Sequence, residues 1–200
     1  MNKVKHIILV IIIGNFTLTN AQNTKWNADP SHSSIGFSID HLVVSETTGE
    51  FNEYSMNVIA DADDFSDAKF DVIIQVAGID TKDEKRDTHL RSADFFDVEK
   101  FSTITFIGKK FKRVKGDEYK VVGDITMHGV TKTIELDAKF GGIVKDPWGG
   151  TRAGLKVWGE IDRYDFGLRY NSLLEAGGLS IGQMVRIECR LELIKESVGN

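Results

Sequence analysis

The sequence predicts an all-β protein: a single antiparallel β-barrel of eight strands, with a short helical cap between the third and the fourth strand. From residue 33 onward, apolar and polar side chains alternate through most of the chain, which is the pattern of strands with one buried face. Glycine-containing turn signals separate the alternating runs, and neither of the two prolines interrupts a run. One segment, residues 81–101, breaks the alternation and supplies the cap.

The first four strands are expected in the first half of the chain. In the first of them, Ile35, Phe37 and Ile39 share one face with His41, and small or polar residues occupy the opposite face. The same period of two recurs in the runs that follow. The pattern predicts these four strands at residues 34–41, 49–60, 70–76 and 103–109.

The other four strands lie between clear turns. Gly116-Asp117 and His128-Gly129 are typical of hairpin turns, and residues 146–150 form a turn cluster with the sequence Asp-Pro-Trp-Gly-Gly. The pattern predicts these four strands at residues 119–127, 133–140, 153–161 and 184–193.

The cap segment has the features of one or two short helices. Residues 81–84, Thr-Lys-Asp-Glu, fit a helix capping box, and Leu90, Ala93 and Phe96 follow at helical spacing. We expect Leu90, Phe95 and Phe96 to pack onto the barrel, either as a lid over one end of the core or as the lining of a ligand entrance. A barrel of this size has room for packed side chains or for one small ligand. The alternation of apolar and polar residues does not distinguish these two possibilities.

The N-terminus has the three regions of a secretory signal peptide. Lys3, Lys5 and His6 form a basic start, Ile7–Leu18 is almost wholly apolar, and residues 19–21 are short. We predict a signal peptide at residues 1–21, followed by a single domain at residues 22–200. The apolar run is too short for a comfortable membrane span, so the expected location is the periplasm or the exterior, without stable membrane insertion after cleavage. A retained N-terminal anchor is the alternative.

Charge and motifs exclude several functions. The formal net charge is −5, and the one basic run, residues 109–115, lies beside a hairpin turn, so no nucleic-acid partner is expected. The single cysteine, Cys189, lies on the apolar face of its strand and is expected to be a buried, inert thiol. The histidines lack metal-ligand spacing, and neither a nucleophile elbow nor a phosphate loop occurs. We therefore predict no metal, no cofactor and no catalytic residue.

Five sequence motifs, taken together and in order, resemble a known family. They are Trp26-x-x-Asp29-Pro30-x-His32-Ser33-x-Ile35-x-Phe37-x-Ile39-x-His41, Gly49-Glu50-Phe51, Lys85-Arg86-Asp87-x-His89-Leu90-Arg91-Ser92-x-Asp94-Phe95-Phe96-Asp97-Val98, Gly123-Asp124-Ile125-Thr126-Met127-His128-Gly129-Val130-Thr131-Lys132 and Arg163-x-Asp165-Phe166-Gly167-Leu168. Over residues 24 to 194 the chain resembles the YceI-like polyisoprenoid-binding family of bacterial exported proteins. One departure is visible, because Phe101-Ser102-Thr103 stands where the family often has a proline.

The resemblance implies a lipocalin-like extended barrel without an agreed catalytic site. It also implies an exported lipid-binding protein that sequesters or carries a polyisoprenoid, an isoprenoid quinone or a similar long-chain amphiphile, and it leaves open a homodimer. Burial of each CH₂ group would contribute about 0.8 kcal/mol to such binding. This driving force discriminates weakly between chains of similar length. The alternatives are a structural or interaction barrel filled by its own side chains, or an enzyme that acts on a bound lipid through a cluster of His and Asp.

The resemblance and the alternation together nominate candidate site residues. The apolar ones, expected to line a tunnel or simply to pack the core, are Phe37, Ile39, Phe51, Phe106, Leu136, Leu155, Ile161 and Phe166. The polar ones, expected to select a head group at one end, are His41, His89, Asp94 and Arg163. We expect Asp162 and Asp165 to form a surface or loop salt-bridge set around Arg163. We expect the group around Asp29 to hold the N-terminal segment against the barrel.

Overall fold

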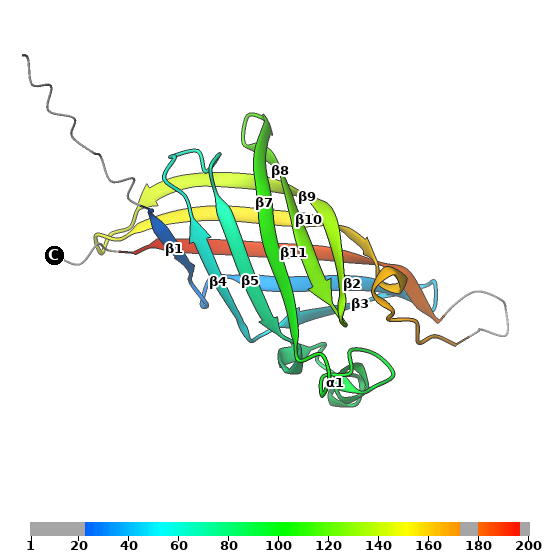
Figure 1. The fold of residues 1–200 in the computed structure, drawn as a ribbon. Helices are drawn as coiled ribbons and strands as arrows, with labels where there is room; N and C mark the ends of the chain where they lie inside the picture. Colours follow the sequence, from blue (N-terminus) through cyan, green and yellow to red (C-terminus); the bar gives the residue numbers. More distant parts are fainter. Residues whose placement is uncertain (1–22, 173–179, 197–200) are drawn as a thin grey trace, which may run out of the picture.

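The computed structural model describes residues 23–172 and 180–196, and in them the chain forms a closed antiparallel barrel of eight strands (Figure 1). Each neighbouring pair is antiparallel, and the last strand pairs back onto the first. In order around the ring the strands are β1 (Lys25–Ala28), β4 (Tyr54–Ile59), β5 (Lys69–Gln75), β7 (Thr103–Lys115), β8 (Glu118–Met127), β9 (Val130–Lys145), β10 (Thr151–Asp162) and β11 (Ile181–Lys195).

Three of the eight strand positions around the ring, which we call staves, each consist of two shorter strands. The long strand β11 pairs with β1 near its C-terminal end and with β2 (Ser34–His41) along the rest, so β1 and β2 form one stave. In the same way β3 (Ser45–Phe51) continues into β4, and β5 continues through the 3₁₀-helix η1 (Val76–Gly78) into β6 (Ile79–Asp80). The expected strand at residues 49–60 is therefore interrupted at Asn52 and Glu53, while the expectation of eight staves is confirmed.

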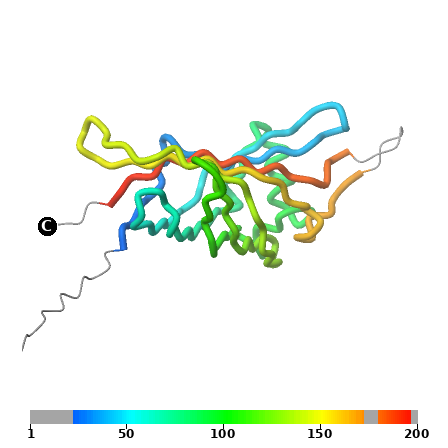
Figure 2. Tube along the Cα trace, turned by 90° about the horizontal axis from the view of Figure 1, so that it is seen from above, coloured from blue at the N-terminus to red at the C-terminus, as the bar shows by residue number. Residues whose placement is uncertain are grey.

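The breaks separate the barrel into two ends that differ. At the closed end, β1 pairs with both β4 and β11 and completes the ring. At the open end, β5 pairs with β7 only as far as Gln75 and Thr103, and β6 then turns to pair with β3. The cap, with its helix α1 (Glu84–Arg91), lies at this second end, below the ends of β5 and β7 in Figure 1. Seen from above in Figure 2, the β2–β3 and β9–β10 hairpins extend in opposite directions, so the barrel is elongated.

The start of α1 corrects the predicted capping box. Asp83 is the N-cap, and its carboxylate accepts hydrogen bonds from the backbone N–H groups of Lys85 and Arg86. Thr81 is buried instead, and both its N–H and its hydroxyl donate to Asp87 Oδ1, at 2.9 and 2.6 Å. The sequence assigned the helix N-cap to the wrong residue because threonine and aspartate both suit that position. Hydrogen bonds of Thr81 to the buried carboxylate of Asp87 leave Asp83 as the N-cap.

Aromatic side chains fill the closed end. Phe65, in the loop between β4 and β5, is fully buried against Trp26 and Phe140, with ring centroids at 5.0 and 4.8 Å. Phe111 stacks on Tyr119, whose hydroxyl donates to the backbone of the same loop at 2.7 Å. The cap contributes to a second cluster at the open end, where Leu90 and Phe96 pack against the barrel as expected. Phe95 is buried too, and its ring packs against His89 and Tyr170. None of the helices in the described residues is long and apolar enough to cross a membrane.

Candidate ligand-binding cavity

The interior of the barrel contains a cavity of about 540 Å³, within the range of small-molecule sites. The strands β2, β3, β4, β5, β7, β8, β9, β10 and β11 all contribute side chains to its wall, and the cap covers it. Exposed side chains of α1 and residues of the β2–β3 hairpin also line it, so the cavity reaches the surface between these two elements. We call this opening the mouth.

The wall is apolar because the strand period turns one residue in two inward. Seven of the eight apolar candidates line the cavity, namely Phe37, Ile39, Phe51, Phe106, Leu136, Leu155 and Ile161. Phe166 does not line it. It lies in the 3₁₀-helix η2 (Arg163–Phe166), outside any alternating strand, and packs fully buried into the cluster at the open end. Contact of any of these residues with a ligand stays a prediction.

Two glycines allow aromatic rings to lie flat along the wall. A Cβ atom on Gly49 would lie 2.5 Å from Cζ of Phe37, and one on Gly123 would lie 2.4 Å from Cζ of Phe106. Both distances are far below a normal contact between carbon atoms. The glycines therefore leave room for each ring against the neighbouring strand, and this placement keeps the rings from filling the middle of the barrel.

Sequence reasoning missed much of the wall. Phe70, Val72 and Ile74 of β5 line the cavity, as do Phe111 and Val121 closer to the closed end. Their alternation with polar neighbours is the same signal that found Phe37 and Ile39, so they were detectable. Tyr170, which follows η2, also lines the cavity, but no period marks it, because it belongs to no strand.

The polar candidates gather at the mouth with one exception. His41, His89 and Arg163 line the cavity, whereas Asp94 does not and is exposed. His89 Nε2 lies 3.0 Å from Asp94 Oδ2, so Asp94 orients His89. The His89 ring also packs edge-on against Tyr170, with centroids 4.7 Å apart.

Arg163 is held inside the wall rather than in a surface or loop ion-pair set, which corrects the expectation for Asp162 and Asp165. Its side chain donates to backbone carbonyl groups that follow η2 and begin β11. Asp165 pairs with Lys132 at 2.9 Å, and Asp162 accepts from the backbone N–H of Tyr164. Burial lowers the pKa of Arg163 from its usual value, although a guanidinium keeps its charge in proteins.

Cys189 faces the cavity from the middle of β11. Its side chain is partly accessible and lines the cavity wall, yet burial raises the pKa of the thiol to about 12. The two facts agree if the accessible surface faces the apolar interior rather than bulk water. A thiol with this pKa is neutral at physiological pH, which agrees with the expected inert cysteine.

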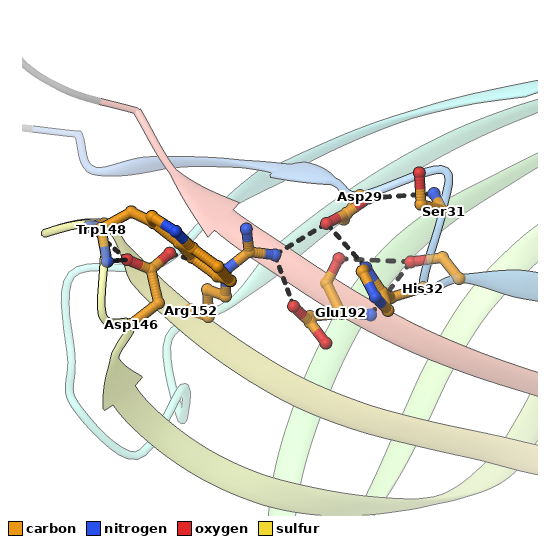
Figure 3. Close-up of polar contacts among 9 residues, drawn as sticks. Asp29, Ser31, His32, Asp146, Trp148, Arg152 and Glu192 are labelled. Carbon is orange, nitrogen blue, oxygen red and sulfur yellow. Dashed lines mark hydrogen bonds and ion pairs between the residues drawn. The ribbon is translucent and has the colours of Figure 1, made fainter.

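A polar network fastens the N-terminal segment at the closed end (Figure 3). Arg152 donates to Asp29 at 2.7 Å, to Asp146 at 2.8 Å and also to Glu192. His32 Nδ1 lies 3.1 Å from Asp29. Hydrogen bonds from Arg152 and then His32 lower the pKa of Asp29 to about 2.

The same network explains a group that resembles a metal site. Donor atoms of Asp29, His32 and Glu192 all lie within 4.8 Å of one another. However, the guanidinium of Arg152 already bonds both carboxylates and supplies the positive charge that they face. The geometry is therefore that of a staple between β10, β11 and the segment that joins β1 to β2, as expected for the group around Asp29.

Sequence comparison identifies similar proteins across nearly the whole described chain. The family model described as the YceI-like domain matches residues 26–193. A UPF0312 protein of Staphylococcus aureus strain MSSA476 is 39% identical over 170 residues, which is 84% of this chain and 96% of the relative.

Solved structures show the same barrel. A YCEI protein of Campylobacter jejuni is 31% identical with a TM-score of 0.67, over 79% of this chain and 90% of the other. BcnA of Burkholderia cenocepacia has a TM-score of 0.72 at 19% identity, over 82% and 98% of the two chains. A polyisoprenoid binding domain from Saccharophagus degradans has a TM-score of 0.63 at 15% identity, over 86% and 98%. The last two likenesses concern the fold alone.

Proposed function

Because the chain belongs to the YceI-like domain family, we propose that it is an exported lipid-binding protein that carries or sequesters one long-chain amphiphile. The ligand is a polyisoprenoid, an isoprenoid quinone or a similar molecule. Its apolar chain lies in the barrel, and its head group lies at the mouth. The role is binding rather than catalysis, and it requires no cofactor. Its place of action is the periplasm or the exterior, after removal of a signal peptide that lies outside the described residues.

The cavity is the observation that carries this proposal. Most of its lining residues are Ile, Val, Leu, Met and Phe, contributed by nine strands and by the cap. Transfer of an apolar chain from water into such a wall is worth about 0.8 kcal/mol per CH₂, and this gain offsets the cost of ordering the chain. A barrel filled by its own side chains would not leave about 540 Å³ within its walls.

The position of the polar groups supports a single orientation of the ligand. Aromatic rings block the closed end, and the polar lining residues lie at the mouth. An amphiphile therefore enters with its apolar chain first. The Saccharophagus degradans neighbour, described as a polyisoprenoid binding domain, supports this class of ligand.

Two measurements on protein that is produced with export in a bacterial host test the proposal. Native mass spectrometry detects a bound ligand, and organic extraction of the same protein then releases the ligand for fragmentation. We expect a stoichiometric adduct whose fragments form an isoprenoid ladder. The same sample sprayed under denaturing conditions is the control, since a noncovalent adduct is lost there. A bare protein that also fails to bind added polyprenols and quinones would contradict the proposal and leave a structural or interaction module.

A further inference from the structure

In the part of the chain that the structure describes, one nitrogen atom of Arg163 has no hydrogen-bond acceptor. The guanidinium carries five N–H groups. Nε donates to the carbonyl of Gly182 at 2.8 Å, and the two N–H groups of Nη1 donate to the carbonyls of Leu168 and Tyr170. Among residues 23–172 and 180–196, Nη2 is buried and has no partner, and the whole residue is only 3% exposed. A buried donor without an acceptor is uncommon and destabilises the folded protein. An acceptor on a bound ligand would remove this cost.

The charge of Arg163 also lacks a partner. Within residues 23–172 and 180–196, no carboxylate forms an ion pair with it. By contrast, Arg152 and Arg186 each have a carboxylate oxygen at 2.7 Å. The ring of Tyr164 covers one face of the Arg163 guanidinium, with its centroid 4.7 Å away. A buried cation without a counter-charge is strongly unfavourable, and an anion in the cavity would compensate it.

The surroundings of the mouth favour the same sign of charge. Lys85 and Arg86 of α1 line the cavity there. The acidic side chains nearby are already engaged: Asp40 pairs with Arg186 at 2.7 Å, and Asp83 caps α1. The charged lining residues are therefore three cations, Lys85, Arg86 and Arg163, against two carboxylates that already have partners, Asp40 and Asp83.

We propose that Arg163, a buried guanidinium in the cavity wall whose Nη2 has no acceptor and whose charge has no carboxylate partner within the described residues, selects amphiphiles whose head group carries an anionic oxygen, namely a phosphate or a carboxylate. The inference rests on the proposed function and adds the class of head group to it. Since Nε and Nη1 are bound to the backbone, only Nη2 remains. The head group therefore meets the two N–H groups of Nη2 alone, and the fork of two guanidinium nitrogens is not available for bidentate binding. Neutral amphiphiles such as alcohols and quinones lose this contribution.

The test compares amphiphiles that share one chain. Geranylgeranyl phosphate, geranylgeranoic acid and geranylgeraniol are titrated by calorimetry into the ligand-free protein, and inorganic phosphate serves as a separate arm. The anions add a charge–charge attraction to the hydrogen bond that the guanidinium can also give an alcohol, so we expect both anions to bind about tenfold or more tightly than the alcohol. Inorganic phosphate alone should neither bind measurably nor displace the phosphate ester.

Variants locate the source of the preference. Arg163→Gln should bring the anion-to-alcohol ratio close to one, and Arg163→Lys should retain most of it, because lysine keeps the charge. Arg190→Gln, on the exposed face of the same strand β11, is the matched control and should leave the ratio unchanged. Thermal unfolding of each variant shows whether it folds. If Arg163→Gln does not fold, the wild-type ratio and Arg163→Lys carry the test.

Each contrary outcome has a distinct meaning. Equal binding of the alcohol and the anions by the wild-type protein overturns the head-group inference but leaves the carrier function intact. A ratio that survives in folded Arg163→Gln, or is lost in folded Arg163→Lys, overturns the role of the Arg163 charge. Binding of inorganic phosphate as tight as that of the ester assigns the site to the free ion. Failure of all three amphiphiles to bind overturns the proposed function itself, and the inference with it.

Discussion

The two ends of this barrel use the same strand period for different purposes. At the closed end, inward-facing aromatic rings meet in the middle, and a network around Arg152 fastens the first segment across two strands. At the open end, the ring of strands splits, a helix covers the gap, and the interior is hollow. Two arginines differ in the same way, because the partly buried Arg152 forms ion pairs with three carboxylates, whereas no carboxylate of the described residues forms an ion pair with the buried Arg163.

This difference indicates that the closed end mainly stabilises the fold and that the open end mainly binds the ligand. The closed end has dense packing and paired charges, which stabilise the folded state. The open end has empty volume and an unsatisfied donor, and both are unfavourable until a ligand enters. Substitutions at the closed end should therefore change stability, and those in the cavity should change binding.

The largest effect is expected from Phe65→Ala at the closed end. The ring is fully buried between Trp26 and Phe140, and its removal should cost about 3–5 kcal/mol of unfolding free energy. Phe96→Ala, which removes a half-buried ring at the open end, should cost roughly 1–2 kcal/mol. Chemical denaturation followed by tryptophan fluorescence measures both. Equal losses of unfolding free energy in the two variants would contradict the expected difference between the two ends.

A charge in the cavity should abolish binding while a charge on the adjacent residue does not. Phe106 lines the cavity, and Ile107 points outward and is 56% exposed. Phe106→Asp places a carboxylate against the apolar chain and should weaken binding by about 100-fold or more, and Phe37→Asp should act likewise. Ile107→Asp should bind normally. The same calorimetric titration decides, and unchanged retention in a folded Phe106→Asp variant would remove Phe106 from the site.

The smallest effect concerns acid stability at the closed end. The pKa of Asp29 is about 2 in the folded protein, against about 3.9 for an unperturbed aspartate. Because the folded value is the lower one, the carboxylate stabilises the fold fully above about pH 4, and this contribution is lost as the pH falls through about 2.

Asp29→Asn should therefore be less stable than the wild type at neutral pH, and the difference should shrink as the pH falls from 4 towards 2. Unfolding free energies measured over that range test this expectation, with Asp71→Asn on the exposed side of β5 as the control. A difference that stays constant with pH would show that Asp29 acts through packing rather than through its charge.

Local periodicity predicted the staves well but not their interruptions. Strict alternation fixes which side chains point inward, so the wall residues from Phe37 to Ile161 could be named from the sequence. The strand β1 has only four residues and shows no period. The break before β4 depends on pairing of Asn52 and Glu53 with η1 and its neighbours, which lie far along the chain.

The site could be predicted where it is made of strands and not where it is made of loops. Phe166 was predicted on the wall from the resemblance and the alternation, but it lies in η2, where it is buried in the core. Arg163 was assigned to adjacent aspartates because they are near in sequence. Its acceptors include Gly182, nineteen residues away, and only the closure of β11 onto β10 brings that carbonyl within reach.

The central claim is that an apolar chain occupies the barrel with its far end toward the closed end. Photo-crosslinking tests this most directly, with an amphiphile that carries a diazirine at the tip of its chain, followed by peptide mapping of the modified residues. The account predicts modification of Phe70, Phe111 or Val121, which line the deep part of the cavity. Modification of exposed residues such as Ile73 and Ile107 instead, or no modification above background, would contradict it.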